Sequence, residues 1–108
     1  MQILSTIATY GGSPIVLSSL FTSVPRCTRV TIQPASGSHV AFVETAGVAT
    51  GATDTTDGVI YRLASYSASG ILDHYDLVVQ KGSNEISLDS LQVDGTSGEQ
   101  CKVTVFVQ

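Results

Sequence analysis

Short runs of β-branched and aromatic residues, bounded by turn-forming residues, are the feature that most limits how this chain can fold. Six runs fit strands: TRVTIQ (28–33), HVAFVE (39–44), GVIYRL (58–63), YDLVVQ (75–80), DSLQV (89–93) and KVTVFVQ (102–108). Two weaker candidates, QILSTIAT (2–9) and PIVLSSLF (14–21), flank the turn signal GGSP. No window has a helical apolar stripe, so we expect at most one short helical turn, in SSLFTS (18–23) or GSNEISL (82–88).

About eight short strands predict an all-β fold, because an antiparallel sheet must cover its apolar face with a second sheet. We expect one small antiparallel β-sandwich, jelly-roll-like or Ig-like, spanning residues 1–108, in which 1–25 form an N-terminal arm or an extra hairpin. SLQVDG, the loop TSGE and CKVTVFVQ (101–108) fit a closing hairpin. The last run has no charge after Lys102 and no proline, so we expect it inside a sheet rather than at an open edge.

Composition disfavours several classes of partner. Charged residues make up 13 % of the chain, against roughly 25 % in typical soluble proteins, so Ser and Thr supply much of the polar surface. The net charge is −4 and the five basic residues are scattered, which disfavours nucleic acid as a partner. No run approaches the roughly 20 apolar residues of a membrane span, and no positive charge precedes Arg26 as in a signal peptide. We expect a soluble protein with neither a membrane partner nor an export signal.

The two cysteines are expected to be free thiols without a disulfide. Strand alternation places Cys27 on the outward face with Arg29 and Thr31, whereas Cys101 shares the inward face of Val103. A single bridge would also be unlike the dense framework of a small secreted domain.

The most enzyme-like segment is DHYD (73–76), which contains His74. In an extended segment neighbours alternate sides, so Asp73 and Tyr75 face away from the imidazole. No Ser or Cys stands in a nucleophile motif. We therefore expect an exposed strand entry, no enzyme activity, no cofactor and no small-molecule substrate.

Metal and sugar sites receive little support. His39 and His74 are far apart, and the cysteines lack zinc-site spacing. Asp54 and Asp57 in ATDTTDG could offer oxygens to calcium, but the pattern lacks the alternating ligands of an EF-hand, so turn formation is the preferred interpretation. The chain has no Trp, and its four tyrosines show no repeated spacing that would indicate a sugar platform.

Three segments are candidates for contact with a partner protein. Ile71 and Leu72, with Tyr66, belong to the loop YSASGILD, which either plugs the core or meets a partner. Ile3 and Ile7 lie in the apolar run 2–9, which could add a strand to a neighbour's sheet. TAGVATGATDTTDG (45–58) is expected to be a projecting loop, or a strand added at a sheet edge, ordered mainly by a neighbouring subunit.

The runs VTIQPASGSHVAFVE, GVIYRLAS and ISLDSLQVDGTSGEQCKVTVFVQ, within residues 28–108, resemble small all-β virion proteins of tailed bacteriophages, of the capsid decoration or cement type. The resemblance implies a structural protein on the outside of the capsid, bridging neighbouring capsomers as a dimer or trimer. Its partners would be the major capsid protein and itself, and its location the virion. The rival hypothesis is a monomeric binding module, such as an adhesin or a receptor- or carbohydrate-binding domain, including a tail or neck component.

Overall fold

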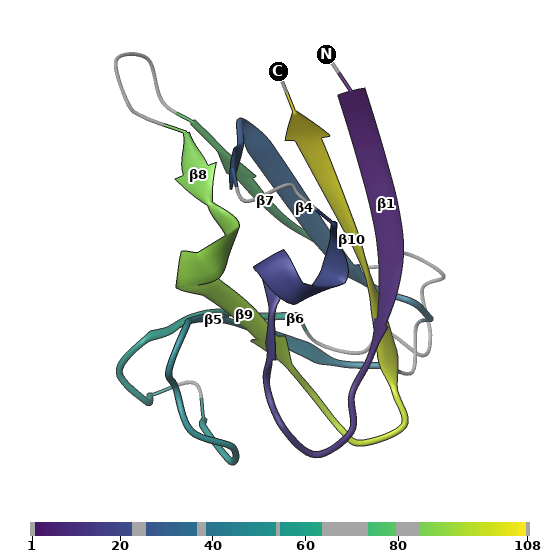
Figure 1. The fold of residues 1–108 in the computed structure, drawn as a ribbon. Helices are drawn as coiled ribbons and strands as arrows, with labels where there is room; N and C mark the ends of the chain where they lie inside the picture. The colour runs from purple at the N-terminus through teal and green to yellow at the C-terminus, as the bar shows by residue number, and fades with distance from the viewer. Residues whose placement is uncertain are drawn as a thin grey trace.

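Alternating apolar residues build two four-stranded antiparallel sheets in the computed structural model, which describes residues 2–22, 26–36, 39–53, 55–63, 74–79 and 85–107 (Figure 1). The first sheet has the order β1 (Gln2–Thr9), β10 (Gln100–Val107), β4 (Arg29–Pro34) and β7 (Tyr75–Val78). The second has the order β2 (Ile15–Val16), β9 (Leu91–Asp94), β5 (Ala41–Thr45) and β6 (Val59–Leu63). A short ladder joins β3 (Arg26–Cys27) to β8 (Ile86–Ser87).

The strand pairs are nested around the loop between β5 and β6. β1 pairs with β10, β2 with β9, β3 with β8, β4 with β7 and β5 with β6, all antiparallel. The chain is thus one long hairpin that is rolled up, and rolling brings β4 beside β10 and β5 beside β9. This topology is that of an eight-stranded jelly roll rather than an Ig-like sandwich. The all-β sandwich predicted from the sequence is confirmed.

The core lies between the two sheets. β4 contributes Val30 and Ile32, β10 contributes Val103 and Val105, and β5 contributes Val43 from the facing sheet, all essentially inaccessible to water. Two 3-10 turns, η1 (Leu17–Leu20) and η2 (Leu88–Ser90), bury their first leucines against the same core. Each such side chain contributes roughly 1.5–3 kcal/mol by leaving water.

The expected closing hairpin is wrong, although the expected position of the last strand is confirmed. β10 lies inside the first sheet between β1 and β4, whereas β9 lies in the second sheet. The turn at 96–99, closed by Glu99 N donating to Thr96 O (2.9 Å), therefore carries the chain from one sheet to the other. Gly98 has φ of 88° and donates to Tyr10 O (2.8 Å), which forms a glycine bulge opposite β1.

The N-terminal segment is neither an arm nor an added hairpin. β1 belongs to the first sheet and β2 to the second, so both are built into the sandwich. Part of the weak strand candidate 14–21 is the 3-10 turn η1, and η2 makes a second turn where one at most was expected. Neither turn is long enough to cross a membrane, and no other helix occurs among the described residues.

The expected outward position of Cys27 is wrong. Thr28 bends the chain between β3 and β4 and donates its N–H to Phe106 O (2.8 Å), so the alternation counted from β4 does not continue back to Cys27. Cys27 and Cys101 are both buried free thiols. Burial raises the pKa of each thiol, which keeps it protonated and unreactive at neutral pH.

Candidate contact surfaces

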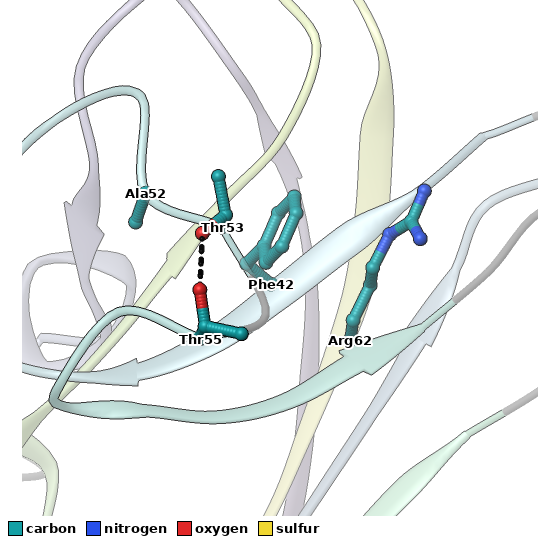
Figure 2. A pocket seen from close by; sticks show the side chains of 5 residues that line it. All are labelled: Phe42, Ala52, Thr53, Thr55 and Arg62. Carbon is teal, nitrogen blue, oxygen red and sulfur yellow. Dashed lines mark hydrogen bonds between the residues drawn. The ribbon is translucent and has the colours of Figure 1, made fainter.

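The outer face of the second sheet carries a hollow of about 350 Å³ above Phe42. Figure 2 shows Phe42 of β5 and Arg62 of β6 beside Ala52, Thr53 and Thr55 of the loop between these strands. The guanidinium carbon of Arg62 lies 5.8 Å from the centre of the Phe42 ring, a cation–π distance. The hydroxyls of Thr53 and Thr55 are hydrogen-bonded to each other at 3.1 Å. The hollow thus offers an aromatic floor with hydroxyls and a guanidinium at its rim.

A second hollow of about 270 Å³ adjoins the first and shares Phe42 and Ala52 with it. Its lining also includes Asp94 of β9. The remaining lining residues are Gly12, Thr50, Gly51, Gly95 and Thr96. The two hollows make one indented surface, which we call the Phe42 face.

The loop that borders the Phe42 face is attached to its own sheet by the buried amide of Gln92, besides a backbone hydrogen bond from Ala46 N to Ser90 O (2.9 Å). Gln92 Nε2 donates to Glu44 Oε1 (2.7 Å) and to Val48 O (2.9 Å), and Gln92 Oε1 accepts from Gly47 N (3.0 Å). Glu44 is fully buried, and its second carboxyl oxygen has no partner among the described residues. Burial raises the pKa of Glu44; the hydrogen bond from Gln92 opposes that rise, and the nearby Asp94 adds to it.

Contacts within the chain hold the first turn of the loop 45–58. Gln92 bonds to Gly47 and Val48, and ordering of the loop mainly by a neighbouring subunit stays a prediction. Further along, Thr53 N donates to Thr56 Oγ1 (2.9 Å), which closes a local turn. The loop is therefore a preformed wall of the Phe42 face, although Figure 1 shows it extending past the end of the sheet.

The outer face of the first sheet exposes apolar side chains on β1. Ile3 and Ile7, the two residues predicted in this strand for partner contact, are 56 % and 49 % exposed. Phe106 lies opposite Ile3 on β10, and Lys102 lies opposite Ile7. Between these two rows, the hydroxyls of Ser5 and Thr104 are hydrogen-bonded at 3.0 Å.

The far side of the same face carries an ion pair beside the exposed Val78 of β7. Arg29 binds Asp76 with two hydrogen bonds, from Nε (2.8 Å) and from Nη2 (2.7 Å), and its guanidinium carbon lies 5.2 Å from the centre of the Phe106 ring. Thr31 donates to the same carboxylate at 2.9 Å. The hydrogen bond from Arg29 lowers the pKa of Asp76. This ion pair supports the sheet surface, whose exposed large apolar side chains are Ile3 and Ile7 of β1 and Val78 of β7.

The other candidate residues are only partly covered by the structure. Ile71, Leu72, Tyr66, Asp73 and Asp54 lie outside the described residues. Asp57 and His74 are exposed, and no group of three potential metal ligands occurs in the part of the chain that is described.

Sequence reasoning missed the Phe42 face and a pair of tyrosines. In the run HVAFVE, Phe42 and Glu44 share one face of the strand, and Ala41 and Val43 share the opposite face, which is buried in the core. An aromatic side chain beside a charged one on the outer face was the signal that could have indicated the hollow. Tyr61 of β6 and Tyr75 of β7 come together across the two sheets, with ring centres 5.7 Å apart. Their separation in the sequence gave no sign of this contact.

The described residues thus present an indented face on one sheet and exposed isoleucines on the edge strand of the other. Comparison of the chain with protein-family models, with curated proteins and with solved structures finds no match in any of the three.

Proposed function

We propose that this protein is a structural virion protein, which binds the outside of a phage capsid and bridges neighbouring capsomers. The observation that carries the proposal is that one small sandwich presents two different contact surfaces on its two sheets. The Phe42 face lies on the second sheet, and the exposed isoleucines of β1 lie on the first. A protein with two such surfaces can touch two neighbours at once, which is what bridging requires.

The energy of such binding comes from surface complementarity. Covering Ile3 and Ile7 would contribute up to about 1 kcal/mol each, because both are already about half buried in the free chain and full burial of such a side chain is worth roughly 1.5–3 kcal/mol. Repeated seating on a lattice strengthens individually weak contacts through effective concentration. In this proposal the partners are the major capsid protein and further copies of the chain, and the location is the capsid surface. Jelly rolls occur in viral capsid proteins and in lectins, an analogy of fold that suits this function without identifying it.

Co-sedimentation with emptied phage heads that lack their own decoration protein tests the proposal. The wild-type protein should pellet with the heads saturably and raise their melting temperature. Thr55→Arg, which puts a long charged side chain into the hollow, should weaken binding at least tenfold. Thr22→Arg is the matched control, because Thr22 is also exposed but lies outside both hollows. A wild-type protein that stays in the supernatant with every head tested contradicts the proposal.

The Phe42 face itself favours a second candidate, a monomeric binding module for a sugar or a peptide. Its volume falls in the range of small-ligand sites, and an aromatic floor beside hydroxyls suits a ring stacked on Phe42. In this case the isolated chain should bind one class of glycan or peptide on an array, and Thr55→Arg should abolish that binding without any capsid present.

A further inference from the structure

We propose that two copies of this chain associate edge to edge through β1, which joins their first sheets into one continuous eight-stranded sheet. The dimer rests on the proposed function for its role in an assembly, but its formation can be measured without a capsid. Its basis is the hydrogen-bonding direction of β1, the state of the other sheet edges and the self-complementary spacing of Ile3 and Ile7.

The backbone groups of alternate β1 residues point away from β10. Tyr10 N donates to Glu99 O (3.0 Å), which extends the β1–β10 register by one pair beyond Thr9 and Gln100. Hydrogen-bonded pairs alternate along an antiparallel ladder, so the even-numbered residues of β1 direct both N–H and C=O toward β10. Ile3, Ser5, Ile7 and Thr9 direct theirs to the open edge, since β1 pairs with no other described strand.

β1 is also the sheet edge with the least protection against pairing. Edge strands are usually protected against pairing by charged residues, by proline or by irregular backbone. The eight residues of β1, QILSTIAT, contain no charged residue, no proline and no glycine. The other three edges of the two four-stranded sheets differ: β2 has two residues, β7 has four and carries Asp76, and β6 carries Arg62. The β3–β8 ladder has only two residues in each strand. A long uncharged edge with exposed isoleucines is the one suited to a second strand.

A two-fold axis beside Ser5 matches the edge to itself. In antiparallel pairing centred there, Ser5 faces Ser5 of the second copy, and Ile3 faces Ile7 of the second copy on the same outer surface. Three hydrogen-bonded pairs then supply about six backbone hydrogen bonds. The isoleucines that are half exposed in the monomer become two cross-strand pairs, a contact worth roughly 0.2–1 kcal/mol each beyond alanine.

The side chains of β10 next to β1 are compatible with this register. Phe106 lies opposite Ile3 within one chain, so the row would read Phe106, Ile3 and then Ile7 of the second copy, all apolar. Ile7 is followed by Lys102 on the far side, and the central row continues the Ser5–Thr104 hydroxyl pair across the axis. β1 brings no charge to the junction, so no like charges face each other there.

Sedimentation equilibrium and light scattering of the purified chain test the dimer, over about 10 μM to about 1 mM, a range suited to weak association. The wild-type mass should rise with concentration toward twice 11.3 kDa. Ser5→Pro removes an edge N–H without removing a β1–β10 backbone hydrogen bond; of the contacts to β10 it loses the one between the Ser5 and Thr104 hydroxyls. It should therefore remain monomeric while keeping the wild-type circular dichroism spectrum. Constant monomer mass for the wild type, or undiminished association of a folded Ser5→Pro, overturns the dimer.

Cysteine cross-linking tests the register. Paired Ser5→Cys residues would lie about 5.5 Å apart between Cα atoms, within disulfide range, so this variant should form a covalent dimer under mild oxidation. Ile3→Cys is the matched control: the two copies of residue 3 would be about 14 Å apart along the strands and should not cross-link. Equal cross-linking of both variants contradicts the register. If Ser5→Cys cross-links but the wild type does not bind phage heads, the dimer stands and the proposed function falls.

Discussion

Replacing Gln92 by leucine should destabilise the protein by about 2–4 kcal/mol. The side chain makes three hydrogen bonds, with Glu44 Oε1, Val48 O and Gly47 N. A buried group left without a partner costs roughly 1–3 kcal/mol, and more when it is charged. Glu44 is fully buried and takes the largest penalty, whereas Gly47 is exposed and can bond to water instead. At roughly 4–8 °C per kcal/mol for a small domain, the melting temperature should fall by about 10–30 °C.

A double-mutant cycle measured by urea denaturation separates the contact from general damage. Glu44→Leu and Gln92→Leu should each be destabilising, while the double variant should recover about 1–3 kcal/mol, since removing both polar partners leaves neither orphaned. Amide exchange at Gly47 should accelerate in Gln92→Leu, because its N–H loses its acceptor. Strictly additive effects, or a cost below about 1 kcal/mol for Gln92→Leu, would refute the idea that this amide holds the loop.

Three further predictions concern packing and pH. Gly95→Ala would place a Cβ in steric conflict with the Tyr10 ring and should cost about 1–3 kcal/mol in urea denaturation. Gly11→Ala, by contrast, meets no atom within 4 Å and should stay within about 0.5 kcal/mol of wild type. Because the pKa of Glu44 is raised, the folded state binds a proton more tightly than the unfolded chain, so stability should fall as pH rises from the ordinary pKa of 4.5 toward the raised pKa. Glu44→Gln should abolish this slope in pH-dependent melting. The lowered pKa of Asp76 has the opposite effect: its stabilisation is present above the ordinary pKa of 3.8 and is lost as pH falls through the lower pKa of the folded state. Asp76→Asn should remove this loss of stability at acid pH.

Strand alternation predicted the faces of long strands but not the places where alternation breaks. Val30 and Val103 are buried as their runs indicate, because a strand with one solvated face must alternate. Cys27 is buried against expectation, since the bend at Thr28 resets the count. Strand pairing was harder to predict from the sequence than the faces of the strands. β9 and β10 are neighbours in sequence yet lie in different sheets, and no local sequence pattern predicts that the chain crosses from one sheet to the other between them.

The candidate contact surfaces also differ in how far the sequence alone could predict them. Ile3 and Ile7 were predicted from sequence to contact a partner; the structure shows that both are exposed, and the contact itself stays a prediction. Glu44 and Gln92 were missed because two polar residues on the outer face of strands look like solvent-exposed positions. Only the return of the loop over that face buries them, and the two residues are 48 positions apart.

The nested pairing explains why the two surfaces arise in one small fold. Every strand pairs with a counterpart at a similar distance from the loop 46–58, so this loop is the apex of the rolled hairpin and β1 with β10 is its outermost pair. Rolling places the outermost pair in the first sheet and the innermost pair, β5 with β6, in the second. The apex loop returns over the outer face of its own sheet through Gln92 and borders the Phe42 face, while β1 is left at an edge of the other sheet. Because the contact surfaces belong to opposite ends of the same nested series, substitutions that block β1 should leave the Phe42 face intact, and the two can be tested independently.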